Sequence, residues 1–152
     1  MSDREQVLLE RAYVLHQRPY RNTSMIVECL TERHGRQSFV AQGARRAERR
    51  PRTPLEPFRP LRVSWVRRGE LGRLTELEAE RASIGLNGDA LLAGFYLNEL
   101  LLRLLPRGDQ NEPIYRCYSH CLDRLAAAKP AARAVRLFEL DLLDALGYRV
   151  DL

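Results

Sequence analysis

Long apolar runs are missing from this chain of 152 residues. No run approaches the ~18 apolar residues that a membrane-spanning helix needs. The first twenty residues carry Asp3, Glu5 and Glu10, and they lack the apolar core of a signal peptide. With 45% apolar and 30% charged residues, the composition is that of a globular protein. We therefore expect a soluble protein that remains in the cytoplasm, where it is made.

Lysine is nearly absent, since 24 of the 25 basic residues are arginine and Lys129 is the exception. A GC-rich genome explains this preference, as does a need for planar guanidinium groups that bind phosphate. The placement of the arginines along the chain says more than their number. Residues 1–82 hold 17 arginines against 11 acidic residues, a net charge of +6, whereas residues 83–152 have a net charge of −1. This asymmetry indicates that the first half meets a polyanion and the second half has another task.

The sequence is also poor in residues that carry catalysis or bind metals. Three cysteines fit a reducing cytoplasm. Cys117 and Cys121 would share a helix face, but no second Cys/His pair completes a zinc site, which favours buried structural thiols. Glu76, Glu78 and Glu80 alternate along a predicted strand and could in principle hold Mg²⁺, although such a pattern is more typical of a solvated face. We expect no enzyme, no cofactor and no metal.

The hydrophobic period changes from 2 to 3.6 near residue 87. Strands are expected over 7–17, 25–31, 37–41, 58–66 and 71–80, with a break at Arg18-Pro19-Tyr20-Arg21-Asn22. Five strands in about 80 residues predict a small closed or nearly closed barrel, because an open sheet would leave edges unpaired. Helices are expected over 90–105 after an Asp89 cap, from an Asn111 cap to Lys129, and over 131–146. The fold class is a β-barrel domain (1–82) followed by a small all-α domain (83–152).

A barrel that binds single strands combines phosphate contacts with aromatic rings on which bases stack. The stretch 44–57 has too few apolar residues to pack and predicts a mobile loop that either contacts phosphate or is a solvated linker. Its candidate phosphate contacts are Arg45, Arg46, Arg49, Arg50 and Arg52. Candidate contacts on the barrel itself are Arg18, Arg21 and Arg36, and Tyr20 is the candidate stacking ring.

The first and third predicted helices are apolar over more than half their circumference. Three short helices cannot bury that much surface among themselves, so we expect a groove or a further stretch of chain to cover it.

The chain resembles a known family, the bacterial recombination mediator RecO. The segments that carry the resemblance include Ala12-Tyr13-Val14-Leu15-His16, Arg18-Pro19-Tyr20, Ala41-Gln42-Gly43-Ala44-Arg45, Gly94-Phe95-Tyr96-Leu97-Asn98-Glu99 and Arg136-Leu137-Phe138-Glu139-Leu140. The resemblance implies an OB-fold barrel and a helical domain. It also implies a non-enzymatic DNA repair and recombination protein that binds single- and double-stranded DNA and anneals strands. Such a protein works with RecR and RecF to load RecA onto strands covered by single-strand binding protein, SSB.

The resemblance further implies that the helical domain docks the acidic, Phe-ended tail of SSB. Arg136, beside Phe138, matches a basic position near that site, and Arg103 would form a wall of the pocket; alternatively, Arg136 is an ordinary surface residue.

Members of the family are longer, and many carry a four-cysteine zinc site that Cys117 and Cys121 do not match. The chain is either a shortened form or a naturally short member, and its uncovered apolar surface would favour self-association. The competing functional hypotheses are a protein-interaction adaptor with weak DNA affinity and, more remotely, a metal nuclease.

Overall fold

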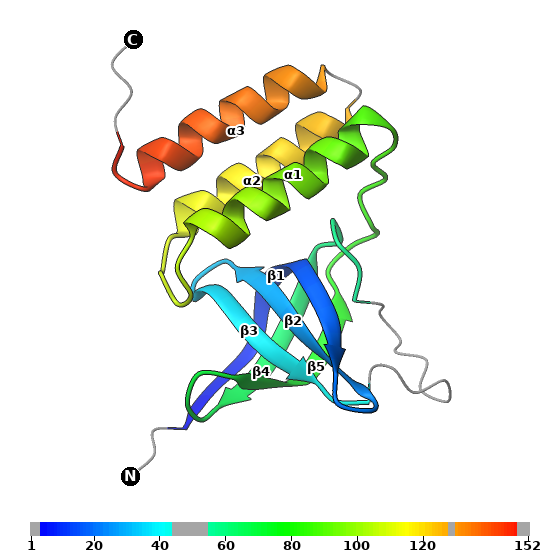
Figure 1. Cartoon of the computed structure of the whole chain (residues 1–152), viewed down its shortest axis with the longest axis vertical. Helices are drawn as coiled ribbons and strands as arrows, with labels where there is room; N and C mark the ends of the chain where they lie inside the picture. Colours follow the sequence, from blue (N-terminus) through cyan, green and yellow to red (C-terminus); the bar gives the residue numbers. More distant parts are fainter. Residues whose placement is uncertain (1–3, 44–54, 128–129, 149–152) are drawn as a thin grey trace.

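A computed structural model describes residues 4–43, 55–127 and 130–148 of the chain. Five strands come first: β1 (Glu5–Tyr20), β2 (Ser24–Thr31), β3 (Gly35–Ala41), β4 (Leu61–Arg67) and β5 (Gly72–Ala79). Three helices follow: α1 (Asp89–Leu104), α2 (Glu112–Ala126) and α3 (Ala131–Ala145). The strands close into a barrel in the order β1-β2-β3-β5-β4, and the helices cover one end of it (Figure 1). This is the five-stranded architecture of the OB fold, so the predicted fold class is confirmed.

Strand β1 changes its partner halfway along its length. Residues from Glu5 to Ala12 pair with β4, and residues from Ala12 to Tyr20 pair with β2. The predicted break at Arg18-Pro19-Tyr20 is wrong, because Pro19 lies opposite Met25 within the ladder. That half of β1 pairs with a single strand, and proline is tolerated where one side of a strand is unpaired. The strand therefore carries its arginines to the far end of the barrel.

Alternating side chains of the strands fill the barrel interior. Val27 and Cys29 of β2, Phe39 of β3 and Trp65 of β4 are all fully buried there. The rings of Phe39 and Trp65 pack with their centroids 4.7 Å apart. The interior is closed by apolar packing, so any ligand of this barrel must bind on its outside or at its rim.

The ends of α1 and α2 follow local capping rules with one exception. Asp89 was expected to cap α1, but Gly88 occupies that position and Asp89 lies in the first helical turn. Asn111 caps α2 as predicted, since its Oδ1 accepts a hydrogen bond from the backbone N–H of Ile114 at 3.3 Å. The predicted end of this helix at Lys129 lies outside the described residues.

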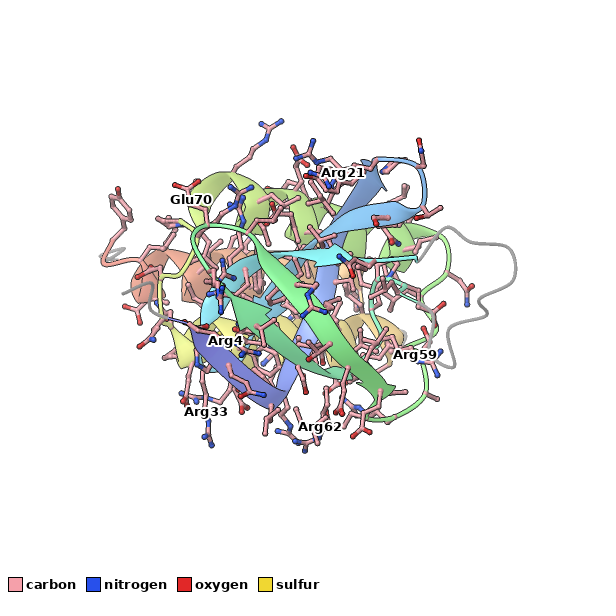
Figure 2. The ribbon with its side chains drawn as sticks, turned by 90° about the horizontal axis from the view of Figure 1, so that it is seen from below. Arg4, Arg21, Arg33, Arg59, Arg62 and Glu70 are labelled. Carbon is pink, nitrogen blue, oxygen red and sulfur yellow. The ribbon has the colours of Figure 1, made fainter. Side chains whose placement is uncertain are left out.

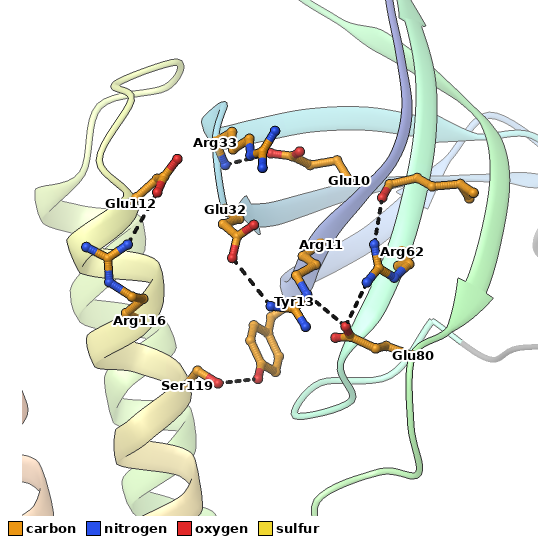
Figure 3. A network of polar contacts seen from close by, with 11 residues as sticks. Glu10, Arg11, Tyr13, Glu32, Arg33, Arg62, Glu80, Glu112, Arg116 and Ser119 are labelled. Atoms are coloured by element: carbon orange, nitrogen blue, oxygen red, sulfur yellow. Dashed lines mark hydrogen bonds and ion pairs between the residues drawn. The ribbon is translucent and has the colours of Figure 1, made fainter.

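A second core joins the helices to the outer face of the barrel. Tyr13, Leu15 and Leu30 point outward from β1 and β2 and pack among buried side chains of the three helices. The hydroxyl groups of Tyr13 and Ser119 lie 2.9 Å apart across this junction (Figure 3). The barrel and the helices therefore share one continuous apolar core.

Phe58 belongs to that junction and not to a strand. It was predicted to begin the fourth strand, but its φ is +63° and β4 begins at Leu61. Its ring packs edge-on against Phe95 at 5.2 Å and lies so close to Gly94 that an added Cβ would stand 2.7 Å from the ring. Gly94 thus allows α1 to approach the chain just before β4.

Helix α1 leaves apolar side chains in solvent, as its broad apolar arc predicted. Leu92 is 70% exposed, Phe95 is 48% exposed and Tyr96 is 43% exposed. No helix in the described part of the chain is long and apolar enough to cross a membrane.

Candidate nucleic-acid interface

The turn between β1 and β2 brings three of the predicted DNA contacts together. Arg18 is exposed near the end of β1, Tyr20 ends the strand, and Arg21 begins the turn with a φ of +55°. The Arg21 guanidinium carbon lies 5.1 Å from the centroid of the Tyr20 ring. This is a cation–π arrangement, and Tyr20, the candidate stacking ring, is half-buried. The β1–β2 turn lies at the end of the barrel away from the helices (Figure 1).

Arg36 lies apart from this group, at the junction of the barrel and the helices, and its contact with DNA stays a prediction from sequence. Its Nη1 donates hydrogen bonds to the backbone carbonyls of Leu102 at 2.8 Å and Leu105 at 2.9 Å, at the end of α1. Its Nε lies 3.3 Å from Oε2 of Glu28, and the side chain is only 14% exposed. Three of the five N–H donors of this guanidinium are therefore engaged within the protein, at the junction of barrel and helices.

Glu28 is the centre of a buried polar cluster at the same junction. Its Oε1 accepts from Ser38 Oγ at 2.7 Å and from Arg107 Nη2 at 2.6 Å, while Oε2 faces Arg36. Burial raises the pKa of Glu28. The hydrogen bonds from Ser38 and Arg107 and the charges of Arg107 and Arg36 lower it, and they outweigh the effect of burial. The pKa of Glu28 therefore lies below its ordinary value. Through Arg36 and Arg107, the cluster therefore links β2 and β3 to the end of α1 and the segment after it.

A second group of arginines, which the sequence analysis did not single out, surrounds the hairpin between β4 and β5. Arg4, Arg67, Arg68 and Arg73 line one hollow there, together with Leu71. Figure 2 looks at this end of the barrel and shows Arg4 and Glu70 in the left part of the view, with Arg21 at the top. The sequence signal was the turn Arg67-Arg68-Gly69, but the membership of Arg4 and Arg73 depends on strand pairing.

Arg45, Arg46, Arg49, Arg50 and Arg52 all lie outside the described residues, and they remain predictions from sequence.

The predicted docking residues on the helices are not brought together. Phe138 is fully buried in the core that the helices share, and its role beside a docked peptide stays a prediction. Tyr96 Oη donates to Glu139 Oε2 at 2.8 Å, and α1 and α3 run in the same direction (Figure 1). Arg103 lies seven residues beyond Tyr96 and Arg136 three residues before Glu139, so they are about 15 Å apart along the helices. Arg103 also pairs with Glu99 at 2.8 Å.

A different groove on the helical side combines guanidinium groups with apolar side chains. It has a volume of about 500 Å³ and lies where α2 and α3 meet. Its described lining residues are Arg124, Pro130, Arg133, Ala134 and Leu137, and no carboxylate is among them. Leu137 is 36% exposed. This lining suits an acidic segment with an apolar side chain better than the separated pair Arg103 and Arg136 does.

Of the acidic groups considered as metal ligands, Glu80 has arginine partners, whereas Glu76 and Glu78 are exposed on β5. Glu80 Oε1 lies 2.7 Å from Arg11 Nε and 3.2 Å from Arg62 Nη2 (Figure 3). Burial raises the pKa of Cys121 to about 11, and the thiol donates to the Ala134 carbonyl at 3.4 Å. Burial also raises the pKa of Cys117. Among the residues described, no group of three His, Cys, Asp or Glu side chains could hold a metal ion.

Comparison with known proteins agrees with the architecture in both halves. The family model "Recombination protein O N terminal" matches residues 6–82, and "Recombination protein O C terminal" matches residues 86–152. Similar proteins named DNA repair protein RecO occur in Methylococcus capsulatus (47% identity over 99% of this chain) and Nitrosococcus oceani (48% over 93%). The protein of that name from Cupriavidus metallidurans is 44% identical over 93% of the chain. The matched regions span 62%, 58% and 47% of these relatives, respectively. The chain belongs to the recombination protein O family, RecO.

Proposed function

We propose that the barrel binds single-stranded DNA through its phosphates and that the chain serves DNA repair as a binding mediator, not as an enzyme. The observation that carries this proposal is the group formed by Arg18, Tyr20 and Arg21 at the β1–β2 turn. In OB folds, this turn and the β4–β5 hairpin flank the face that takes oligonucleotides. Two guanidinium groups beside an aromatic ring offer both phosphate contacts and a surface for a base.

The chemistry of such contacts is electrostatic and independent of sequence. Each phosphate that a guanidinium neutralises releases condensed counterions, so affinity for single strands falls with salt by about 0.7 in log–log slope per contact. The barrel interior is filled by residues such as Phe39 and Trp65, so bases would lie on the outer surface or at its rim. The same surface would accept double-stranded DNA through its phosphates.

We further propose that the helical layer docks proteins while the barrel holds DNA. The β1–β2 turn lies at the end of the barrel away from the helices (Figure 1), so a strand bound there leaves the helices accessible. This separation supports a mediator that anneals strands and, with RecR and the RecF pathway, helps to load RecA onto DNA covered by SSB. Such a protein would work at the chromosome, in the cytoplasm.

For the SSB tail, which is acidic and ends in Phe, the groove between α2 and α3 is the better candidate site. Arg124 and Arg133 would face its carboxylates, and Leu137 would contact its apolar residue. A tail peptide should then bind Arg133→Ala several-fold more weakly than the wild type. The variant Arg103→Ala should bind normally, because Arg103 is paired with Glu99. The reverse pattern would return the site to the surface near Arg103.

The alternative function is a protein-interaction adaptor whose barrel has little DNA affinity. Fluorescence anisotropy of labelled single-stranded DNA at several salt concentrations separates the two hypotheses. The loop variant with Arg45, Arg46, Arg49 and Arg50 changed to Ala should lower the log–log slope by about 3 if the loop makes four contacts. An unchanged slope would remove the loop from the interface, and a wild type that fails to bind would favour the adaptor.

A matched control removes charge elsewhere. Arg103→Ala/Arg116→Ala deletes two arginines from the helices, where each is paired with a glutamate on its own helix. This double variant should keep the wild-type slope. If it lowers the slope as much as a barrel variant does, the effect comes from net charge and not from local contacts.

A further inference from the structure

Helix α1 carries a stripe of exposed side chains on the side opposite its buried face. The buried residues of the helix are Gly94, Leu97, Asn98 and Leu101. Leu92 lies nine residues before Leu101, which is two and a half helical turns, so the two side chains point in opposite directions. The exposed residues on the side of Leu92 are Asp89, Leu92, Phe95, Tyr96, Glu99 and Arg103. We call these six residues the α1 stripe.

The middle of the α1 stripe is apolar and aromatic. Leu92 is the most exposed large hydrophobic side chain in the described part of the chain. Phe95 and Tyr96 follow it, and each remains nearly half exposed although the Phe58 ring and the Glu139 carboxylate lie beside them. Adjacent exposed apolar and aromatic side chains with charged residues at both ends are typical of a protein interface.

The spacing of the α1 stripe fits a second helix. Steps of three and four residues alternate along it, through Asp89, Leu92, Tyr96, Glu99 and Arg103. This is the pattern of a seam along which two helices pack at a crossing angle of about 20°. The fourteen steps from the first to the last of these residues cover about 21 Å, so a helix of similar length would cover the stripe.

The charges at the two ends of the α1 stripe indicate which helix fits. Asp89 lies in the first turn of α1 and Arg103 in the last. Among the described residues, no cation lies within ion-pair distance of Asp89. Arg103 meets Glu99 at 2.8 Å, but both side chains are exposed and can take a further partner. A complementary helix is therefore basic where the stripe begins and acidic where it ends. Helix α1 of a second copy, running in the opposite direction, meets both requirements.

A parallel pair of α1 helices would not be complementary. It would place Asp89 opposite Asp89 and Glu99 opposite Glu99 of the second copy, and like charges at an interface are repulsive. An antiparallel pair has its two-fold axis beside Tyr96, with Asp89 and Arg103 seven residues to either side. The dipoles of the two helices then also oppose each other.

We propose that the chain forms a two-fold symmetric dimer through antiparallel pairing of its α1 helices. Leu92, Phe95 and Tyr96 form the apolar centre of the interface. Asp89 of each copy pairs with Arg103 of the other. One pair of short helices lies at the lower end of the area that specific interfaces bury, about 1,000 Å², so the dimer forms at micromolar concentrations.

The dimer leaves the proposed DNA-binding surface open. The β1–β2 turn lies at the end of the barrel away from the helices (Figure 1), so pairing through α1 does not cover it. One dimer therefore carries two barrels, each with its own turn exposed. None of the α1 stripe lines the groove between α2 and α3 either.

Sedimentation equilibrium over about 1 to 100 µM, the range expected of a small interface, tests the proposal. The average mass of the wild type should rise from the 17.6 kDa of one chain toward twice that value. Leu92→Glu changes a side chain that is 70% exposed, so the fold should be kept, and the variant should stay monomeric. The matched control Leu8→Glu makes the same change at a leucine of β1 that is 68% exposed, and it should dimerise like the wild type.

A double-mutant cycle tests the antiparallel orientation. Asp89→Ala and Arg103→Ala should each weaken the dimer several-fold. The double variant should weaken it by less than the product of the two single effects, because both substitutions remove the same ion pairs. Effects that simply multiply would contradict antiparallel pairing.

A wild type that stays monomeric over the whole range overturns the proposal, and so does a dimer that Leu92→Glu leaves intact. Circular dichroism verifies that each variant is folded, and Leu92→Gln, which adds no charge, should weaken the dimer as well. The inference does not depend on DNA binding: a dimer that binds no DNA supports it, and a monomer that binds DNA refutes it while the proposed function stands. DNA titrations at protein concentrations below the dimer range keep the Arg103 variants valid as controls.

Discussion

Arg36 gives the sharpest contrast between a structural and a DNA-binding role. As a barrel arginine it could be a phosphate contact, yet its guanidinium donates to the carbonyls of Leu102 and Leu105 and faces Glu28 at 3.3 Å. We predict that Arg36→Ala destabilises the fold without changing how DNA affinity depends on salt.

The expected loss follows from what the substitution leaves behind. Glu28 is 9% exposed and would keep Ser38 and Arg107 as partners but lose one of its two arginines. Removing one partner of a buried pair costs about 3–5 kcal/mol, and the remaining partners place this case at about 3. The end of α1 would also lose a cation that complements its dipole. For a chain of this size the loss corresponds to a fall in Tm of roughly 6–12 °C.

The assay is chemical denaturation followed by circular dichroism, with Arg36→Lys as the second variant. An ammonium group keeps the charge but cannot reproduce the forked donation to two carbonyls and a carboxylate, so Lys should recover less than half of the lost stability. A loss below 1 kcal/mol for Arg36→Ala would refute the junction account. A salt slope reduced by about 0.7 in the folded variant would show that Arg36 does contact phosphate.

Three further predictions concern stability and reactivity. Glu28→Gln should lower the free energy of unfolding by about 2 kcal/mol at pH 7. Because the folded pKa of Glu28 lies below the ordinary 4.5, this loss of stability relative to the wild type should be complete above pH 4.5 and should shrink as the pH falls below it. Denaturation at pH 7, 5 and 3 measures it. Gly35→Ala should lower the free energy of unfolding by more than about 2 kcal/mol, because φ is +69° and the new Cβ would stand 2.1 Å from the Asp109 carbonyl oxygen. The control Gly147→Ala, at φ +92° in open space, should lower it clearly less in the same assay. The Cys121 thiol, with a pKa of about 11, should resist a thiol reagent at pH 8 until the protein unfolds, and rapid labelling of the native protein would contradict its burial.

Local patterns in the sequence predicted the architecture because the barrel and helices obey short-range rules. Val27 and Cys29 alternate with outward residues along β2, and the cap at Asn111 depends on a contact three residues away. Such features can be read from a single segment. The change of period near residue 87 likewise marks the passage from strands to helices.

The contacts that define the candidate site depend on distant segments, and the sequence pattern does not contain them. Arg36 is turned toward carbonyls 66 and 69 residues further along the chain. Arg73 joins Arg67 and Arg68 at one hollow only through the pairing of β5 with β4. Arginine content pointed to the first half of the chain, but strand register decided which arginines face outward, which pair with glutamate and which hold the fold together.

Photo-crosslinking tests the central claim most directly, namely that the end of the barrel away from the helices holds single-stranded DNA. An oligonucleotide with photoreactive bases would be bound at low salt, irradiated, and the attached peptides identified by mass spectrometry. We predict crosslinks at the β1–β2 turn around Tyr20 and at the β4–β5 hairpin around Leu71. Crosslinks confined to α1, α2 and α3 would contradict this account of the molecule.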